Sequence, residues 1–206
     1  GNPYAGIVLS GTVLVAALLR PWPGVVLLLG AALFAGLPFL GADLGGGLTL
    51  VTVAAIWFVV RVRGRFGGRE VALVVLAAVA GLALLVAAHS VLPSGATHVT
   101  RAVEGAGPAD LLEVFLRRLR LNVEATSAIP AAWLAVLGLP AWLLAVWRGP
   151  ARVRLEHDPA WRHAAMVLAA SGMLGYVLND TYGMAAVAFV FVSAAVVVPA
   201  LRWTNG

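Results

Sequence analysis

The feature that most constrains the fold is a succession of long apolar runs, each ended by a short break rich in arginine, proline or glycine. A helix needs about 20 apolar residues to cross the roughly 30 Å hydrocarbon core of a bilayer, and it satisfies its own backbone polar groups there. The runs fall at about residues 4–19, 22–40, 47–62, 70–91, 125–147, 162–178 and 182–201. The sequence therefore predicts an all-α fold, a polytopic membrane bundle of about seven transmembrane helices.

The composition agrees with a chain that faces lipid rather than water. Charged residues make up only 11% of the 206 residues, whereas a soluble domain carries about 25%. The positive charge comes from arginine alone, and the arginines gather at the ends of the apolar runs. This placement is typical of membrane topology and does not indicate a nucleic-acid partner. We expect residues 1–206 to form a single transmembrane domain, and the start at Gly1 suggests a processed chain or part of a longer product.

The arginines also predict an orientation. With the N-terminus outside, the inner breaks and the tail contain Arg20, Arg61, Arg63, Arg65, Arg69, Arg148, Arg152, Arg154, Arg162 and Arg202. The remaining arginines lie in one long outer connector, and most acidic residues fall on the outer side, which matches the positive-inside rule. The exclusive use of arginine, with abundant alanine and glycine, suggests a bacterial source. We therefore expect a bacterial plasma-membrane protein with a cytoplasmic C-terminus and any polar site opening outward.

The outer connector, 92–124, contains a predicted amphipathic helix at 108–123. Pro108 and Asp110 are typical of a helix start. Apolar residues repeat along one face, and the opposite face carries Glu113, Arg117, Arg120 and Glu124. Such a helix lies in the membrane interface with its apolar side down. Asn122 falls on the apolar face, so we expect its amide to bond a backbone group or a polar side chain of the bundle.

Two adjacent polar residues, Asn179 and Asp180, separate the last two apolar runs. Ionisable groups at a lipid boundary are costly and are functional candidates. Ser171 and Gly175 form a small-xxx-small pair, and Asn179 continues the same helical stripe, so we expect its side chain to point into the bundle. Asp180 either binds a proton, cation or substrate, or it caps the following helix.

Asp43, within Gly-Ala-Asp-Leu-Gly-Gly-Gly, also has one structural and one functional interpretation. It is either a polar turn before the third run or one carboxylate of an outer site. If Asp43 and Asp180 share a cavity, the two carboxylates could hold a divalent cation or relay protons. The sequence has no cysteine and no histidine pair with metal-binding spacing, so apart from that cation we expect no metal site and no cofactor.

Two further candidates, His98 and Arg101, precede the amphipathic helix. The arginine fork suits an anionic headgroup or phosphate, but Arg101 could instead pair with Glu104 in a solvated loop. At the inner side, the cluster from Arg152 to Arg162 is interpreted as a topology anchor with local ion pairs.

No catalytic motif is present: lysine and cysteine are absent, and neither HExxH nor GxSxG occurs. Whether the chain is an enzyme stays open.

Four short blocks carry a resemblance to known proteins. They are Gly1-Asn-Pro-Tyr-Ala-Gly6, Thr97-His-Val-Thr-Arg101, Arg118-Leu-Arg-Leu-Asn122 and Leu178-Asn-Asp-Thr-Tyr-Gly183. They resemble blocks of a family of bacterial multi-pass membrane proteins that read roughly Gly-Asn-Glu, Ser-His-x-Gly-Arg, a basic segment ending in Asn, and Asn-Asp-Ser-Gly. Some members carry an alkaline-phosphatase-like extracytoplasmic region.

The resemblance implies that one outward-facing constellation contains His98, Arg101, Asn122, Asn179 and Asp180. It implies no reaction. Pro3 stands where the family has glutamate, and Tyr182 interrupts the Asn-Asp-Ser-Gly block, so a site that uses that glutamate would be altered here.

From these patterns we expect an integral membrane protein with an outward-facing polar site, the membrane domain of a cell-envelope lipid- or polymer-handling system. Its expected partners are the lipid bilayer and a partner protein or an attached extracytoplasmic domain. Two alternatives stay open: a proton- or ion-coupled transporter or channel with Asp180 as the carrier, and a structural subunit of a larger membrane complex.

Overall fold

The computed structural model describes residues 3–37, 40, 43–63, 67–91, 108–179 and 183–203, and these contain helices and no strand. The α-helices are α1 (Pro3–Leu18), α2 (Pro21–Gly36), α3 (Leu44–Phe58), α4 (Gly68–Val91), α6 (Pro108–Ser127), α7 (Ala132–Trp147), α8 (Pro150–Arg154), α9 (Pro159–Leu178) and α10 (Gly183–Trp203). A π-helical turn, η1 (Val59–Arg63), extends α3. The predicted all-α fold is confirmed for this part of the chain.

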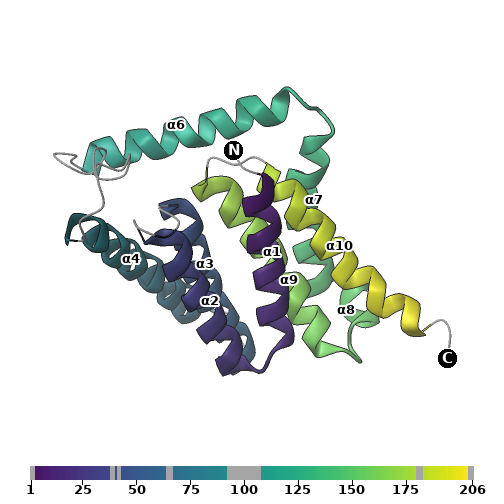
Figure 1. Cartoon of the computed structure of the whole chain (residues 1–206). Coiled ribbons are helices and arrows are strands. Elements are labelled where there is room, and N and C mark those ends of the chain that lie inside the picture. Colours follow the sequence, from purple (N-terminus) through teal and green to yellow (C-terminus); the bar gives the residue numbers. More distant parts are fainter. Residues whose placement is uncertain are drawn as a thin grey trace.

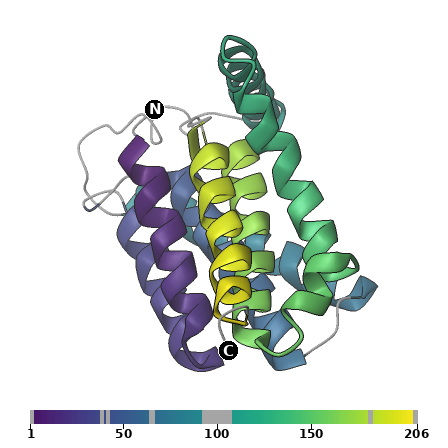
Figure 2. The same cartoon turned by 90° about the vertical axis from the view of Figure 1, so that its right-hand side faces the viewer.

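The long helices form a bundle with α9 near its centre. α9 packs against α1, α3, α7 and α10, whereas α4 lies at the edge and packs mainly on α3. The helix α6 lies across one end of the bundle, as Figure 1 shows, and Figure 2 shows α1, α9 and α10 side by side from a second direction. We call the end beneath α6 the Asp43 end, because α3 begins there, and the opposite end the Arg61 end, because η1 finishes there.

Local chemistry explains where several helices begin. Proline occupies an early helical position in α2, α8 and α9, where its missing N–H is one that a helix start leaves unpaired anyway. The start of α3 is capped instead by Asp43, whose Oδ1 accepts a hydrogen bond from the Gly46 amide at 2.9 Å. A side-chain cap of this kind satisfies one of the free donors of the first turn.

The interior is built from small and branched apolar side chains, with Trp57 as its largest fully buried member. Many large apolar side chains are nevertheless exposed around the described bundle, among them Val8, Val26, Phe34, Leu84 and Leu134. Exposed apolar surface of this extent marks contact with a membrane or a partner. The structure is therefore compatible with a membrane protein.

The number of possible membrane spans is smaller than predicted. Within the described residues, two stretches are long and apolar enough to cross a bilayer, Leu44–Arg63 and Gly68–His89. A third would result if Phe115–Ser127 and Ala132–Trp147, which are bent by 114° at a short break, formed one broken span. The structure thus supports two or three spans by length and composition, and the prediction of seven is wrong on this measure.

Helix length accounts for most of the difference. Ala5–Leu18, Pro21–Gly36 and Gly183–Pro199 are apolar but have no more than 17 residues each. At a rise of 1.5 Å per residue such a helix is at most about 26 Å long, short of the roughly 30 Å hydrocarbon core. The central helix α9 also carries Arg162 and His163 close to its start, which lowers its hydropathy.

The amphipathic helix predicted at 108–123 lies within α6, which continues to Ser127. On its charged face, the Arg120 Nε donates to Glu124 Oε1 at 2.7 Å, the i,i+4 pair that the sequence predicts. On its other face Leu116 and Val123 are exposed while Asn122 is buried. Among the α6 side chains whose burial the structure describes, the buried ones are Asn122 and Thr126, so this part of α6 sits tightly on the rest of the bundle.

Candidate binding site

Three of the predicted site residues, Asp43, Asn122 and Asn179, come from separate elements and meet at the Asp43 end. Asn122 Nδ2 donates to the backbone carbonyl oxygens of Tyr176 at 2.7 Å and of Asn179 at 2.6 Å. Asn179 Nδ2 donates in turn to Asp43 Oδ2 at 3.3 Å. One hydrogen-bonded network thus connects α6, the end of α9 and the start of α3.

Asn122 acts as a cap supplied by a distant helix. The last carbonyl groups of an α-helix have no partner within the helix, and the side-chain amide of Asn122 satisfies one of them at the end of α9. Its side chain is only 1% exposed, so the bonds form away from water. One turn further along α6, Thr126 Oγ1 donates to the Asn122 carbonyl at 2.6 Å and lies 3.0 Å from the Tyr176 hydroxyl. The prediction that Asn122 finds a backbone partner is confirmed.

A close approach of two backbones brings Asp43 and Asn179 together. A Cβ atom on Gly45 would lie 2.7 Å from the Leu178 carbonyl oxygen and 3.3 Å from the Asn179 Cα. Only glycine leaves room for the start of α3 to pack this tightly on the end of α9. Asn179 is 4% exposed, which confirms the prediction that it points into the bundle.

The Asp43 carboxylate has acceptor capacity beyond its role as a helix cap. It is half-buried and receives the Gly46 amide on Oδ1 and the Asn179 amide on Oδ2. An ionised carboxylate offers about four lone-pair positions, so each oxygen can accept a further donor. The network therefore holds a negative charge in place without using all of its hydrogen-bonding capacity.

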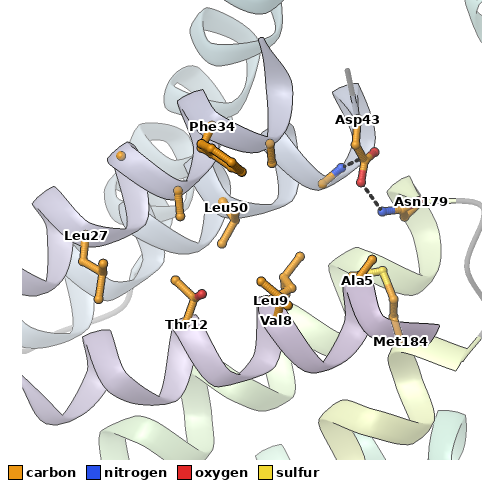
Figure 3. A pocket seen from close by; sticks show the side chains of 14 residues that line it. Ala5, Val8, Leu9, Thr12, Leu27, Phe34, Asp43, Leu50, Asn179 and Met184 are labelled. Atoms are coloured by element: carbon orange, nitrogen blue, oxygen red, sulfur yellow. Dashed lines mark hydrogen bonds between the residues drawn. The ribbon is translucent and has the colours of Figure 1, made fainter. Parts of the chain in front are cut away.

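A cavity of about 680 Å³ extends from Asp43 and Asn179 between α1, α2 and α3. Its wall is almost wholly apolar, as Figure 3 shows, and Thr12 is the one further polar side chain among its lining residues. Val8 and Phe34, which line it, are 67% and 65% exposed, so the cavity reaches the side of the bundle. Its size falls in the range of about 300–1,000 Å³ that is typical of ligand pockets.

The other predicted site residues are His98, Arg101 and Asp180, and they lie outside the described residues. A site shared by Asp43 and Asp180, which the sequence leaves open, is therefore not tested by the described residues. Within the ranges that the structure describes, no group of three His, Asp or Glu side chains is placed to hold a metal ion.

Some members of the site were not predicted. Thr126 and Tyr176 complete the network behind Asn122, and Gly45 sets the contact between α3 and α9. The sequence does carry a signal for Thr126, because it stands at i+4 from Asn122 on the same face of α6. The sequence carries no signal for the cavity, whose wall is assembled from α1, α2, α3 and Met184 of α10.

Comparison of the chain with protein-family models, with curated proteins and with solved structures finds no match. The resemblance to bacterial multi-pass membrane proteins accordingly stays a prediction.

Proposed function

We propose that this chain is an integral membrane protein that binds an amphiphile, and that it serves as the membrane domain of a cell-envelope lipid- or polymer-handling system. The polar head of the ligand would meet Asp43 and Asn179, and its apolar chain would fill the cavity between α1, α2 and α3. The observation that carries the proposal is the polarity of this cavity, which is polar at one end and apolar along the rest of its wall. An amphiphile has the same distribution of polarity.

The exposure of the cavity rim supports entry from a lipid phase. The exposed residues Val8 and Phe34 belong to helices with apolar outer surfaces, so a ligand reaches the cavity through apolar surroundings. A water-soluble ligand would lose its hydration on that route without gaining polar contacts, because its polar partners lie only at the Asp43 end.

The charge of Asp43 favours a particular headgroup. A half-buried carboxylate attracts an ammonium group or accepts from a hydroxyl, and charge-assisted hydrogen bonds are about twice as strong as neutral ones. An anionic head would be repelled. Among amphiphiles with the same chain, we therefore expect an amine to bind best, an alcohol less tightly and a carboxylate least.

The test uses dodecylamine, dodecanol and dodecanoate with the full chain in lipid nanodiscs, and it measures each dissociation constant. Asp43→Asn removes the charge but keeps a side chain that caps helices equally well, so α3 stays intact. We expect this variant to bind dodecylamine about tenfold more weakly, which is the effect of losing one charge-assisted hydrogen bond. Its affinity for dodecanol should change little.

A matched pair of glycine variants tests the cavity itself. Gly30 lines the cavity and Gly11 does not, and a Cβ on either residue would meet no atom within 4 Å. Gly30→Leu should fill the cavity and weaken all three amphiphiles, whereas Gly11→Leu should leave binding unchanged. If both variants bind like the wild type, the cavity is not the binding site, and the structural-subunit alternative gains support.

A further inference from the structure

A second polar cluster lies at the Arg61 end and is not used by the proposed function. Arg61, in the π-helical turn η1, is half-buried, and its Nη1 donates to His163 Nδ1 on α9 at 3.0 Å. Its guanidinium also lies over the Trp57 ring, 5.1 Å from the ring centroid. Because arginine can only donate, Nδ1 of His163 must accept, so this imidazole is neutral.

The positive charge in this cluster lacks an acidic partner in the described part of the chain. The Nε atoms of Arg61 and Arg162 are buried and have no hydrogen-bond acceptor there. Arg63 provides the contrast, because its Nη1 lies 3.2 Å from Oε1 of the buried Glu70. Arg162 directly precedes His163 on α9, so η1 and α9 each carry an arginine without an acidic partner in the described residues, next to the contact between Arg61 and His163.

Such an arrangement is unfavourable unless an anion completes it. A half-buried guanidinium without a counter-charge loses hydration, and two of them near one neutral imidazole also repel each other. Planar arginine forks fit the oxygens of a phosphate group, and π-helical turns are frequent at functional sites. We infer that Arg61 and Arg162, beside His163, form a binding site for a phosphate group.

The position of the cluster agrees with a phosphate at a membrane surface. The stretch Leu44–Arg63 has 20 residues, which at 1.5 Å per residue is about 30 Å long, and Arg61 stands two residues before its end. The length of the whole stretch equals the thickness of the hydrocarbon core, so a span that begins at the Asp43 end at one membrane surface has Arg61 in its last turn, near the other surface. The phosphate comes either from an anionic lipid headgroup or from a soluble phosphate compound.

The experiment measures thermal unfolding of the full chain in micelles of a maltoside detergent, which contains no phosphate, with phosphatidylglycerol or inorganic phosphate added in increasing amounts. We expect at least one of the two to raise the melting temperature of the wild type. Arg162→Gln should weaken this effect about tenfold in apparent affinity, because one charge-assisted contact is lost. Arg61→Gln should act in the same direction.

The control is Arg152→Gln, which removes the same charge from an exposed position in α8 at the same end of the bundle. It should leave the affinity unchanged, whereas an unspecific attraction between basic residues and the membrane would respond equally to both variants. The buried Nε of Arg162 has no acceptor within the described residues, so its replacement breaks no hydrogen bond there and the protein should fold. Stabilisation by phosphatidylglycerol alone identifies a lipid headgroup, and stabilisation by inorganic phosphate identifies a soluble source. The inference is overturned if neither stabilises the wild type, or if Arg152→Gln and Arg162→Gln have equal effects.

Discussion

Replacing Gly45 by alanine should destabilise the folded bundle by about 2 kcal/mol, although alanine is the better helix former. The added Cβ would lie 2.7 Å from the Leu178 carbonyl oxygen and 3.3 Å from the Asn179 Cα. Both contacts are to backbone atoms, so no side-chain rotation relieves them and the helices α3 and α9 must move apart. The same movement lengthens the hydrogen bond between Asn179 and Asp43, so amphiphile binding should fall together with stability.

Gly11→Ala supplies the control, because a Cβ at Gly11 would meet no atom within 4 Å. There only the helix propensity changes, which favours alanine by up to about 1 kcal/mol. Unfolding in mixed micelles with increasing sodium dodecyl sulfate, followed by circular dichroism, should therefore show opposite signs for the two substitutions. A Gly45→Ala protein as stable as Gly11→Ala would show that the backbone contact between α3 and α9 is not close.

The sequence predicts the all-α class of the described residues correctly, but hydropathy does not predict how many helices are long enough to span a membrane. Hydropathy averaged over a window of residues does not detect a turn when the residues of the turn are themselves apolar. The predicted run 125–147 is an example, because it contains both the end of α6 at Ser127 and the start of α7 at Ala132. The chain bends there by 114°, and nothing in the hydropathy of Ala128–Ala131 distinguishes a bend from a continuous helix.

The burial of the amides in the polar site could be predicted from the sequence, but their partners could not. An amide on an apolar helix face must find a partner when it is buried, which correctly places Asn122 and Asn179 inside the bundle. The identity of the partner depends on how α6 crosses the end of α9, and that crossing angle has no local sequence signal. The cavity beside Asp43 depends likewise on the spacing of four helices, so only the structure shows that the carboxylate has an apolar cavity next to it.

The second large effect is expected at Asn122, where Asn122→Asp should destabilise the protein by about 3 kcal/mol or more. The aspartate has the same shape but no donor, so a buried carboxylate would face the Tyr176 and Asn179 carbonyl oxygens that now accept from Nδ2. Each buried group left without its partner costs about 1–3 kcal/mol, and a buried charge costs more. Asn122→Leu removes the donor without adding charge and should be less harmful than Asn122→Asp.

Hydrogen exchange of α6 gives a readout specific to this role. Loss of the Asn122 bonds should release α6 from α9, so the backbone amides of α6 should exchange much faster while those in the middle of α3 stay protected. Glu124→Gln is the matched control on the same helix, because it affects only the exposed pair with Arg120, which is worth at most about 1 kcal/mol. Because Asn122 also holds the carbonyl of Asn179, undocking of α6 should loosen the contact between Asn179 and Asp43 and weaken dodecylamine binding. Unchanged exchange in Asn122→Asp would mean that α6 is held in place by its apolar contacts and not by this amide.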